Sequence, residues 1–162
     1  MTARVITVTV SDTRTNADDT SGDALVEELA AFTIVRRIIV PDSAAAIVGA
    51  IADAQRVGVD AIVFTGGTGI APRDVTYDAV TSILEKKLDG FGEAFRRLSW
   101  DEIGPRSILS RATAGTINTL LVFLLPGSTQ AARLGARELI APILAHAVDL
   151  LHNKTHHGPK HG

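Results

Sequence analysis

Short apolar segments that alternate with amphipathic ones constrain the fold of this 162-residue chain more than any other feature. Residues 5–10, 32–40 and 61–64 are rich in β-branched and aliphatic side chains, which is typical of strands. Between them, residues 20–29 and 43–57 carry apolar side chains at helical spacing. This order, with short links, predicts an α/β protein with a parallel sheet covered by helices on both faces.

The second half of the chain predicts a more varied set of elements. After the third strand we expect helices over 74–88 and 93–103, strands over 108–117 and 120–125, and a closing helix from about residue 130. Gly90 and Gly92 separate the first two of these helices, because glycine is unfavourable inside a helix.

Polar residues stand where the helices are expected to begin. Thr20 or Ser21, Ser43, Asp74 and Ser128 are each placed to accept a hydrogen bond from a free N–H group of a first helical turn. Such a cap is worth about 1 kcal/mol. For Asp74 and Ser128 this structural role is an alternative to a role in ligand binding.

Composition excludes several classes of protein. A formal net charge of −2 offers no general surface for a polyanion, so no nucleic-acid partner is expected. The absence of cysteine excludes disulfides and thiolate metal sites and suits a reducing cytoplasm. The longest apolar run, residues 120–125, is far shorter than the ~20 residues of a membrane helix, so no membrane partner is expected.

Length and pattern together predict the domain organisation and the location. One domain is expected over residues 1–151, followed by a loose tail over residues 152–162 that mixes His, Gly, Pro and Lys. The N-terminus has no apolar stretch of the kind that secretory signals carry, so we expect a cytoplasmic protein.

A glycine-rich loop, Thr65-Gly66-Gly67-Thr68-Gly69, follows the expected strand at residues 61–64. Glycines leave backbone N–H groups uncovered, which suits an anion such as phosphate. Arg73 and Asp74 come next, and a carboxylate beside a phosphate needs a cation between them, so the segment indicates a metal–phosphate centre. The loop lacks the Gly-Lys-Ser/Thr of a Walker loop and the third small residue of a dinucleotide fingerprint, and a simple tight turn is the alternative.

Three carboxylates, those of Asp12, Asp42 and Asp74, come just after the first three expected strands. If those strands are parallel, their carboxyl ends meet at one edge of the sheet, where open α/β sheets bind ligands. The glycine loop opens at that edge, and so does Pro126-Gly127-Ser128 if its strand is parallel too. We therefore expect the acids and both loops to converge, although each has a simple local explanation as a cap or turn.

A set of motifs spans most of the chain. They are Val10-Ser11-Asp12-Thr13-Arg14-Thr15, Asp19-Thr20-Ser21-Gly22, Val40-Pro41-Asp42, residues 65–76, Gly90-Phe91-Gly92-Glu93, Leu109-Ser110-Arg111 and Leu125-Pro126-Gly127-Ser128. In combination they resemble the MoaB/Mog family of molybdenum cofactor biosynthesis, and the first and last motifs lean toward the MoaB branch. The resemblance covers residues 5 to about 150. It implies a three-layer αβα sandwich with a mostly parallel, mixed sheet and a homo-oligomer, a trimer or a hexamer.

The resemblance also implies an activity, that of a molybdopterin adenylyltransferase. The terminal phosphate of molybdopterin attacks the α-phosphorus of ATP, and pyrophosphate leaves. Asp42 and Asp74 match the family carboxylates that are tied to catalysis and to Mg²⁺. The residues expected to bind molybdopterin and ATP are Ser11, Asp12, Thr65, Gly66, Gly67, Thr68, Gly69, Arg73, Thr76, Pro126, Gly127 and Ser128.

One position departs from the family pattern. Gln130 stands where relatives commonly carry a lysine, so one positive charge near the expected phosphates is missing. Two alternatives to an active enzyme follow: a non-catalytic oligomer that binds molybdopterin or a pathway partner such as the metal-insertion enzyme, and a structural or regulatory oligomer with a vestigial pocket.

Overall fold

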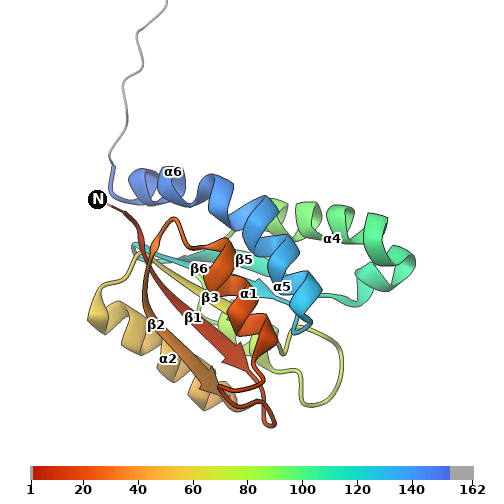
Figure 1. Cartoon of the computed structure of the whole chain (residues 1–162). Helices are drawn as coiled ribbons and strands as arrows, with labels where there is room; N and C mark the ends of the chain where they lie inside the picture. The colour runs from red at the N-terminus through yellow and green to blue at the C-terminus, as the bar shows by residue number, and fades with distance from the viewer. Residues whose placement is uncertain (1, 154–162) are drawn as a thin grey trace, which may run out of the picture.

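A computed structural model describes residues 2–153, which form a six-stranded mixed sheet between two layers of helices (Figure 1). The strands are β1 (Arg4–Val10), β2 (Thr33–Val40), β3 (Ala61–Thr65), β4 (Lys86–Lys87), β5 (Thr113–Ile117) and β6 (Leu120–Leu125). The helices are α1 (Thr20–Glu28), α2 (Ala44–Val57), α3 (Thr76–Thr81), α4 (Asp89–Ile103), α5 (Thr129–Gly135) and α6 (Ala141–Leu151). A 3₁₀ segment, Gly104–Leu109, follows α4, and a π-helical turn, Ala136–Ile140, joins α5 to α6.

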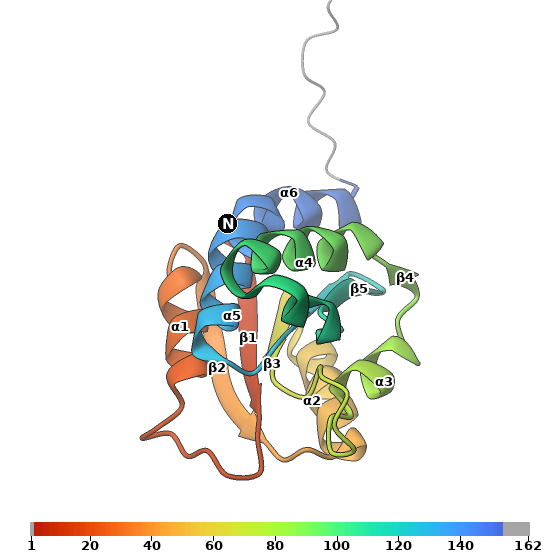
Figure 2. The same ribbon diagram turned by 90° about the vertical axis from the view of Figure 1, so that its right-hand side faces the viewer.

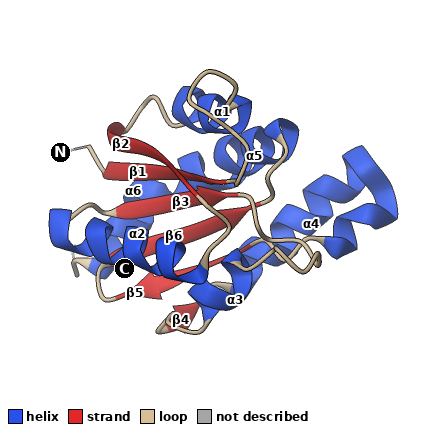
Figure 3. Cartoon of the chain, turned by 90° about the horizontal axis from the view of Figure 1, so that it is seen from below, coloured by secondary structure: helices blue, strands red, loops and turns tan. Residues whose placement is uncertain are grey.

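The order of strands across the sheet is β2-β1-β3-β6-β5-β4 (Figure 3). The first four of these strands are mutually parallel, and β5 is antiparallel to both of its neighbours. The register places Thr65 opposite both Thr9 and Leu125, so β1, β3 and β6 end level with one another. The predicted parallel strands are confirmed, and the loops that follow them open side by side.

Two hydrophobic clusters hold the layers together, one on each face of the sheet. On one face, Val63 and Phe123 pack with side chains from α1, α4, α5 and α6. On the other face, Phe64 and Leu124 pack with side chains from α2 and α3. Figure 2 shows the two helical layers on opposite sides of the strands. Because β3 and β6 are buried on both faces, every one of their positions is buried, which explains their uninterrupted apolar sequences.

The predicted helix over residues 74–88 is wrong. Only Thr76–Thr81 is helical, and the chain then becomes the short strand β4. The N–H groups of Glu85 and Leu88 donate to the carbonyl oxygens of Thr116 and Ala114, at 2.8 Å each, so pairing with β5 replaces helical hydrogen bonds. β5 pairs with β6 along one edge, and its other edge is free to pair with β4. The apolar pattern of residues 74–88 does not indicate that this edge lies beside them.

The boundaries around α4 also differ from prediction. Gly90 and Gly92 lie inside the first turn of α4 rather than ahead of it. Gly92 is needed there for packing, since a Cβ atom would come within 2.5 Å of the carbonyl oxygen of Ala112. The predicted strand over residues 108–117 is shorter, because its first residues complete the 3₁₀ segment and β5 begins only at Thr113.

Two of the four predicted helix caps are confirmed. Ser43 accepts a hydrogen bond from the N–H of Ala46 at 3.3 Å, and Ser128 from that of Ala131 at 3.1 Å. For α1 the cap is Asp19, which accepts from the N–H of Gly22, rather than Thr20 or Ser21. Asp74 is not the cap of α3 either, because its carboxylate turns back to the N–H of Ala71.

Residues 154–162, most of the tail predicted over 152–162, lie outside the described residues. Within residues 2–153, no helix combines the length and the apolar character needed to cross a membrane.

Candidate functional site

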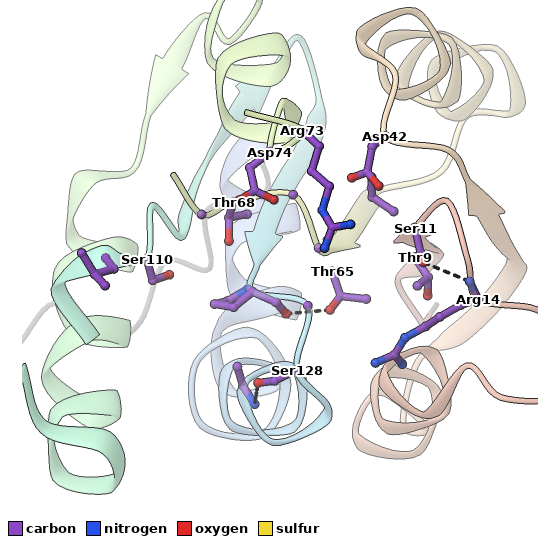
Figure 4. Close-up of a pocket in the computed structure, with 18 of the residues that line it drawn as sticks. Thr9, Ser11, Arg14, Asp42, Thr65, Thr68, Arg73, Asp74, Ser110 and Ser128 are labelled. Atoms are coloured by element: carbon purple, nitrogen blue, oxygen red, sulfur yellow. Dashed lines mark hydrogen bonds between the residues drawn. The ribbon is translucent and has the colours of Figure 1, made fainter. Parts of the chain in front are cut away.

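A cavity of about 550 Å³ opens at the carboxyl ends of β1, β3 and β6. Asp12, Asp42 and Asp74 all line it, as expected for residues that follow parallel strands (Figure 4). The other predicted site residues on its wall are Ser11, Thr65, Gly66, Gly67, Thr68, Gly69, Arg73, Pro126, Gly127 and Ser128. Of the predicted residues only Thr76 stays off the wall: it is fully buried beneath the glycine loop.

The glycine loop is held tightly against the ends of β1 and β6. Gly66 and Gly67 have φ values of +107° and +71°, a region that favours glycine. A Cβ atom on Gly66 would lie 2.5 Å from the carbonyl oxygen of Val10, and one on Gly67 would lie 2.1 Å from Oγ1 of Thr76. The N–H of Gly66 donates to the carbonyl of Leu125 at 2.9 Å. Both glycines are therefore required by backbone conformation and by space.

Three carbonyl groups of this loop, those of Gly67, Thr68 and Gly69, accept hydrogen bonds, whereas the N–H groups of the same three residues donate none within residues 2–153. The carbonyls of Gly67 and Thr68 accept from the N–H groups of Thr76 and Arg111, both at 3.0 Å, and that of Gly69 accepts from the Arg111 side chain. Within residues 2–153 the N–H groups of Gly67, Thr68 and Gly69 donate to no protein acceptor. Consecutive free N–H groups on a cavity wall are suited to an anion.

The opposite wall is acidic. A carboxylate oxygen of Asp12 accepts from the N–H of Asp42 at 2.9 Å, so the two residues are adjacent. Burial, and then the charge of Asp12, raises the pKa of Asp42, Arg73 opposes this rise, and Asp74 adds to it. In Figure 4 the Arg73 side chain extends between Asp74 and Asp42. Carboxylates that are close enough to repel one another favour a cation among them.

A magnesium ion fits this donor set only with help from a substrate. Within residues 2–153, no group of three or more His, Cys, Asp or Glu side chains is arranged to hold a metal by itself. Mg²⁺ is commonly bound by one or two carboxylates together with phosphate oxygens and water. Asp42 and Asp74 meet that requirement as a pair of oxygen donors on the same cavity.

The loop Pro126–Ser128 closes the third side and is tied down by neutral hydroxyl groups. Oγ1 of Thr65 donates to the carbonyl of Pro126 and Oγ of Ser21 to that of Gly127, at 2.7 Å each. Ser128 both lines the cavity and caps α5. Its two predicted roles are therefore compatible in geometry.

Sequence reasoning missed a whole wall of the cavity. Phe95, Ser99 and Ile103 from α4, and Arg106, Leu109 and Ser110 from the 3₁₀ segment and its end, face the glycine loop across the cavity. Arg14 also lines the cavity, and its guanidinium donates to Oγ of Ser21 at 3.0 Å. The spacing of Phe95, Ser99 and Ile103 at every fourth position marks one helix face, but only the packing of α4 shows that this face meets the pocket.

Comparison with known proteins agrees with the fold. Residues 6–146 match a family described as a probable molybdopterin binding domain. Molybdenum cofactor biosynthesis protein B of Staphylococcus carnosus (strain TM300) is 44% identical over 146 residues, which cover 87% of this chain and 86% of that protein. A crystal structure of a molybdenum cofactor biosynthesis protein B is 43% identical with a TM-score of 0.90, covering 94% of this chain and 98% of the other.

A more distant structure keeps the same architecture. The tungsten cofactor synthesizing protein MoaB from Pyrococcus furiosus is 36% identical with a TM-score of 0.83, covering 93% of this chain and 97% of that one. The family match and the fold thus place the chain in the class of probable molybdopterin binding domains with an α/β fold. Within that class, it belongs to the MoaB/Mog family of molybdenum cofactor biosynthesis proteins.

Proposed function

We propose that this protein is a molybdopterin adenylyltransferase that uses Mg²⁺ and ATP. The observation that carries the proposal is that three free N–H groups of the glycine loop and the carboxylates of Asp42 and Asp74 line the same cavity. Such a cavity suits a reaction in which phosphate groups and a divalent cation meet.

The proposed reaction joins two anions. An oxygen of the terminal phosphate of molybdopterin forms a bond to the α-phosphorus of ATP, and the bond from that phosphorus to the bridging oxygen breaks, releasing pyrophosphate. The nucleophile is already ionised, so no strong general base is needed. When bound, Mg²⁺ neutralises and aligns phosphate oxygens. Asp42 and Asp74 would hold it.

The remaining wall residues divide into two proposed roles. Arg73 and the N–H groups of Gly67–Gly69 stabilise negative charge on the transferring phosphoryl group. Ser11, Asp12 and the rest of the glycine loop, with the Pro126–Ser128 loop opposite, hold molybdopterin. Thr76 acts indirectly, because its N–H supports the carbonyl of Gly67 from below.

Release of pyrophosphate from molybdopterin and Mg-ATP is the direct test, with Asp74→Asn as the variant. Asparagine keeps an oxygen that can accept from the N–H of Ala71 but removes the charge. We expect turnover to fall by about 100-fold or more while the thermal midpoint changes little. Asp53→Asn is the matched control, since Asp53 is an exposed α2 residue that pairs with Arg56 and is not among the described residues that line the cavity.

The results separate this function from its alternative. Near-wild-type turnover by Asp74→Asn would overturn the assigned role. A wild-type protein that binds molybdopterin in calorimetry but releases no pyrophosphate would be the non-catalytic binder. In that case Gln130→Lys, which restores the positive charge common in relatives, would be the first substitution to test.

We also propose that the chain works as a homo-oligomer, a trimer or a hexamer, in the cytoplasm, and hands its product to a metal-insertion enzyme. Of the aromatic residues on α4, Phe91 and Phe95 belong to the core, whereas Trp100 is 50% exposed. Sedimentation of the wild type and of Trp100→Ala tests whether this helix contributes to assembly.

A further inference from the structure

Arg111 lies behind the glycine loop, immediately before β5, and is not among the described residues that line the main cavity. Its side chain is 30% exposed. The proposed reaction gives it no role. Within residues 2–153, its hydrogen-bond partners nevertheless all lie in the glycine loop, in the segment that leads from that loop into α3, or in α3 itself.

The backbone and the guanidinium of Arg111 together hold one side of the loop. The N–H of Arg111 donates to the carbonyl of Thr68 at 3.0 Å. Nε and one terminal nitrogen donate to the carbonyl of Gly69 at 3.2 and 2.8 Å, and the same terminal nitrogen reaches the carbonyl of Asp74 at 3.4 Å. Arg111 therefore contacts both ends of the exposed stretch between Gly69 and Asp74.

The guanidinium is itself fixed from the side of α3. It forms a paired contact with the carboxylate of Asp78, at 3.0 and 3.2 Å, and lies 4.6 Å from the centre of the Tyr77 ring. A planar group with several donors in fixed directions can satisfy all of these acceptors at once, whereas the single ammonium of a lysine cannot.

We propose that Arg111 is a positioning residue that orders the glycine loop before a ligand arrives. It occupies the carbonyls on one side of the loop, which leaves the N–H groups of Gly67–Gly69 for an anion, and it fixes the backbone of Asp74. Without it, the loop would be ordered at the moment of binding, and affinity would be lower. The consequence for catalysis rests on the proposed adenylyltransferase function, but the ordering of the loop does not.

The first experiment measures amide hydrogen exchange in the ligand-free protein, comparing wild type with Arg111→Ala and Arg111→Lys. We expect exchange over residues 66–74 to be about tenfold faster in Arg111→Ala and intermediate in Arg111→Lys, with the sheet unchanged. Asp78→Asn is the matched control, because it weakens the ion pair but leaves the bonds to Gly69. Unchanged exchange over residues 66–74 in Arg111→Ala would overturn the proposal.

The second experiment titrates the same variants with inorganic pyrophosphate by calorimetry, at a temperature where all are folded. We expect the dissociation constant to rise about tenfold in Arg111→Ala and less than about twofold in Asp78→Asn. If Arg111→Ala does not fold, Arg111→Lys carries the test, with an increase of about threefold or more expected. Loosened exchange with unchanged pyrophosphate affinity, or no pyrophosphate binding by the wild type, would overturn the proposal. A wild type that binds pyrophosphate but shows no turnover would overturn only the adenylyltransferase function.

Discussion

The two loops that flank the cavity occupy equivalent positions but are built differently. The glycine loop follows β3 and the Pro126–Ser128 loop follows β6, and these strands are parallel neighbours whose last residues, Thr65 and Leu125, are paired. In both loops, carbonyl groups accept hydrogen bonds from neighbouring elements. In the glycine loop the side-chain donor is the cation Arg111, whereas in the other loop the donors are hydroxyl groups of Thr65 and Ser21.

The difference concerns charge and backbone strain. The glycine loop combines positive φ values, free N–H groups and the neighbouring charges of Arg73 and Asp74. The Pro126–Ser128 loop has no positive φ value and leads into a capped helix. We infer that the first loop is specialised for an anionic group and a cation, while the second shapes the cavity and locks the first in place.

The largest difference between the two loops is expected when a methyl group is added to a glycine in each of them. Gly66→Ala should lower the free energy of unfolding by roughly 3 kcal/mol, because it combines a positive φ with a clash against backbone. Gly127→Ala should cost less than about 1 kcal/mol, since its Cβ would lie 3.3 Å from the Cα and 3.9 Å from the backbone nitrogen of Gly66, both milder contacts than that at Gly66. Urea denaturation of both variants measures the difference.

Gly58→Ala separates the two causes. Gly58 also has a positive φ, +74°, but a Cβ there would have no neighbour within 4 Å. Its loss, about 1 kcal/mol, gives the conformational part alone. Equal losses for Gly66→Ala and Gly127→Ala would contradict the view that only the glycine loop is strained.

An intermediate effect is expected at the hydroxyl that secures the Pro126–Ser128 loop. Ser21 is fully buried, donates to the carbonyl of Gly127 and accepts from Arg14. Ser21→Ala should therefore lower the free energy of unfolding by about 1–2 kcal/mol, because these partners are left unsatisfied. Thr20→Ala is the control: it removes an exposed hydroxyl that contacts Thr129 and also accepts from Arg14, and it should cost less because water can replace these contacts. A Ser21→Ala variant as stable as wild type would show that the hydroxyl ties are dispensable.

The smallest expected effect on stability is electrostatic and belongs to the charged side of the cavity. Burial and the neighbouring Asp12 raise the pKa of Asp42, so ionisation of Asp42 costs the folded state stability above that pKa. Asp42→Asn removes this cost and should slightly raise the thermal midpoint at neutral pH, even as turnover is lost. The gain should disappear as the pH falls toward 3.8, the ordinary pKa of the group.

Two further variants sharpen the electrostatic prediction. Arg73 opposes the rise in the pKa of Asp42, so the gain from Asp42→Asn should be larger in an Arg73→Ala background and unchanged in a Ser128→Ala background. Asp53→Asn should have the opposite sign, because its hydrogen bond to Arg56 lowers the pKa of Asp53. Thermal melts over a range of pH values measure all of these, and a loss of stability in Asp42→Asn at neutral pH would contradict the prediction.

Much of the cavity could be predicted from the sequence, because strand periodicity and connection rules place several residues without knowledge of packing. The buried character of residues 61–64 and 120–125 and the alternation with helices define parallel strands, and parallel strands bring Asp12, Asp42 and Asp74 to one edge. The prediction of a helix over 74–88 failed because the free edge of β5, a tertiary partner, competed with a local preference. The prediction of Asp74 as a cap failed because its carboxylate accepts from the nearby N–H of Ala71 instead.

By itself, the sequence determined the central strands, which depend on residues close together in the chain. It also determined the edge at which the acids meet, because each acid follows one of these strands and parallel strands end at the same edge. Only the tertiary structure decided that α4 supplies a wall of the cavity and that Arg111 holds Gly69 from 42 positions away. Contacts of that kind depend on how separate elements pack. The local pattern of polar and apolar residues shows which face of an element is buried, but not which other element covers it.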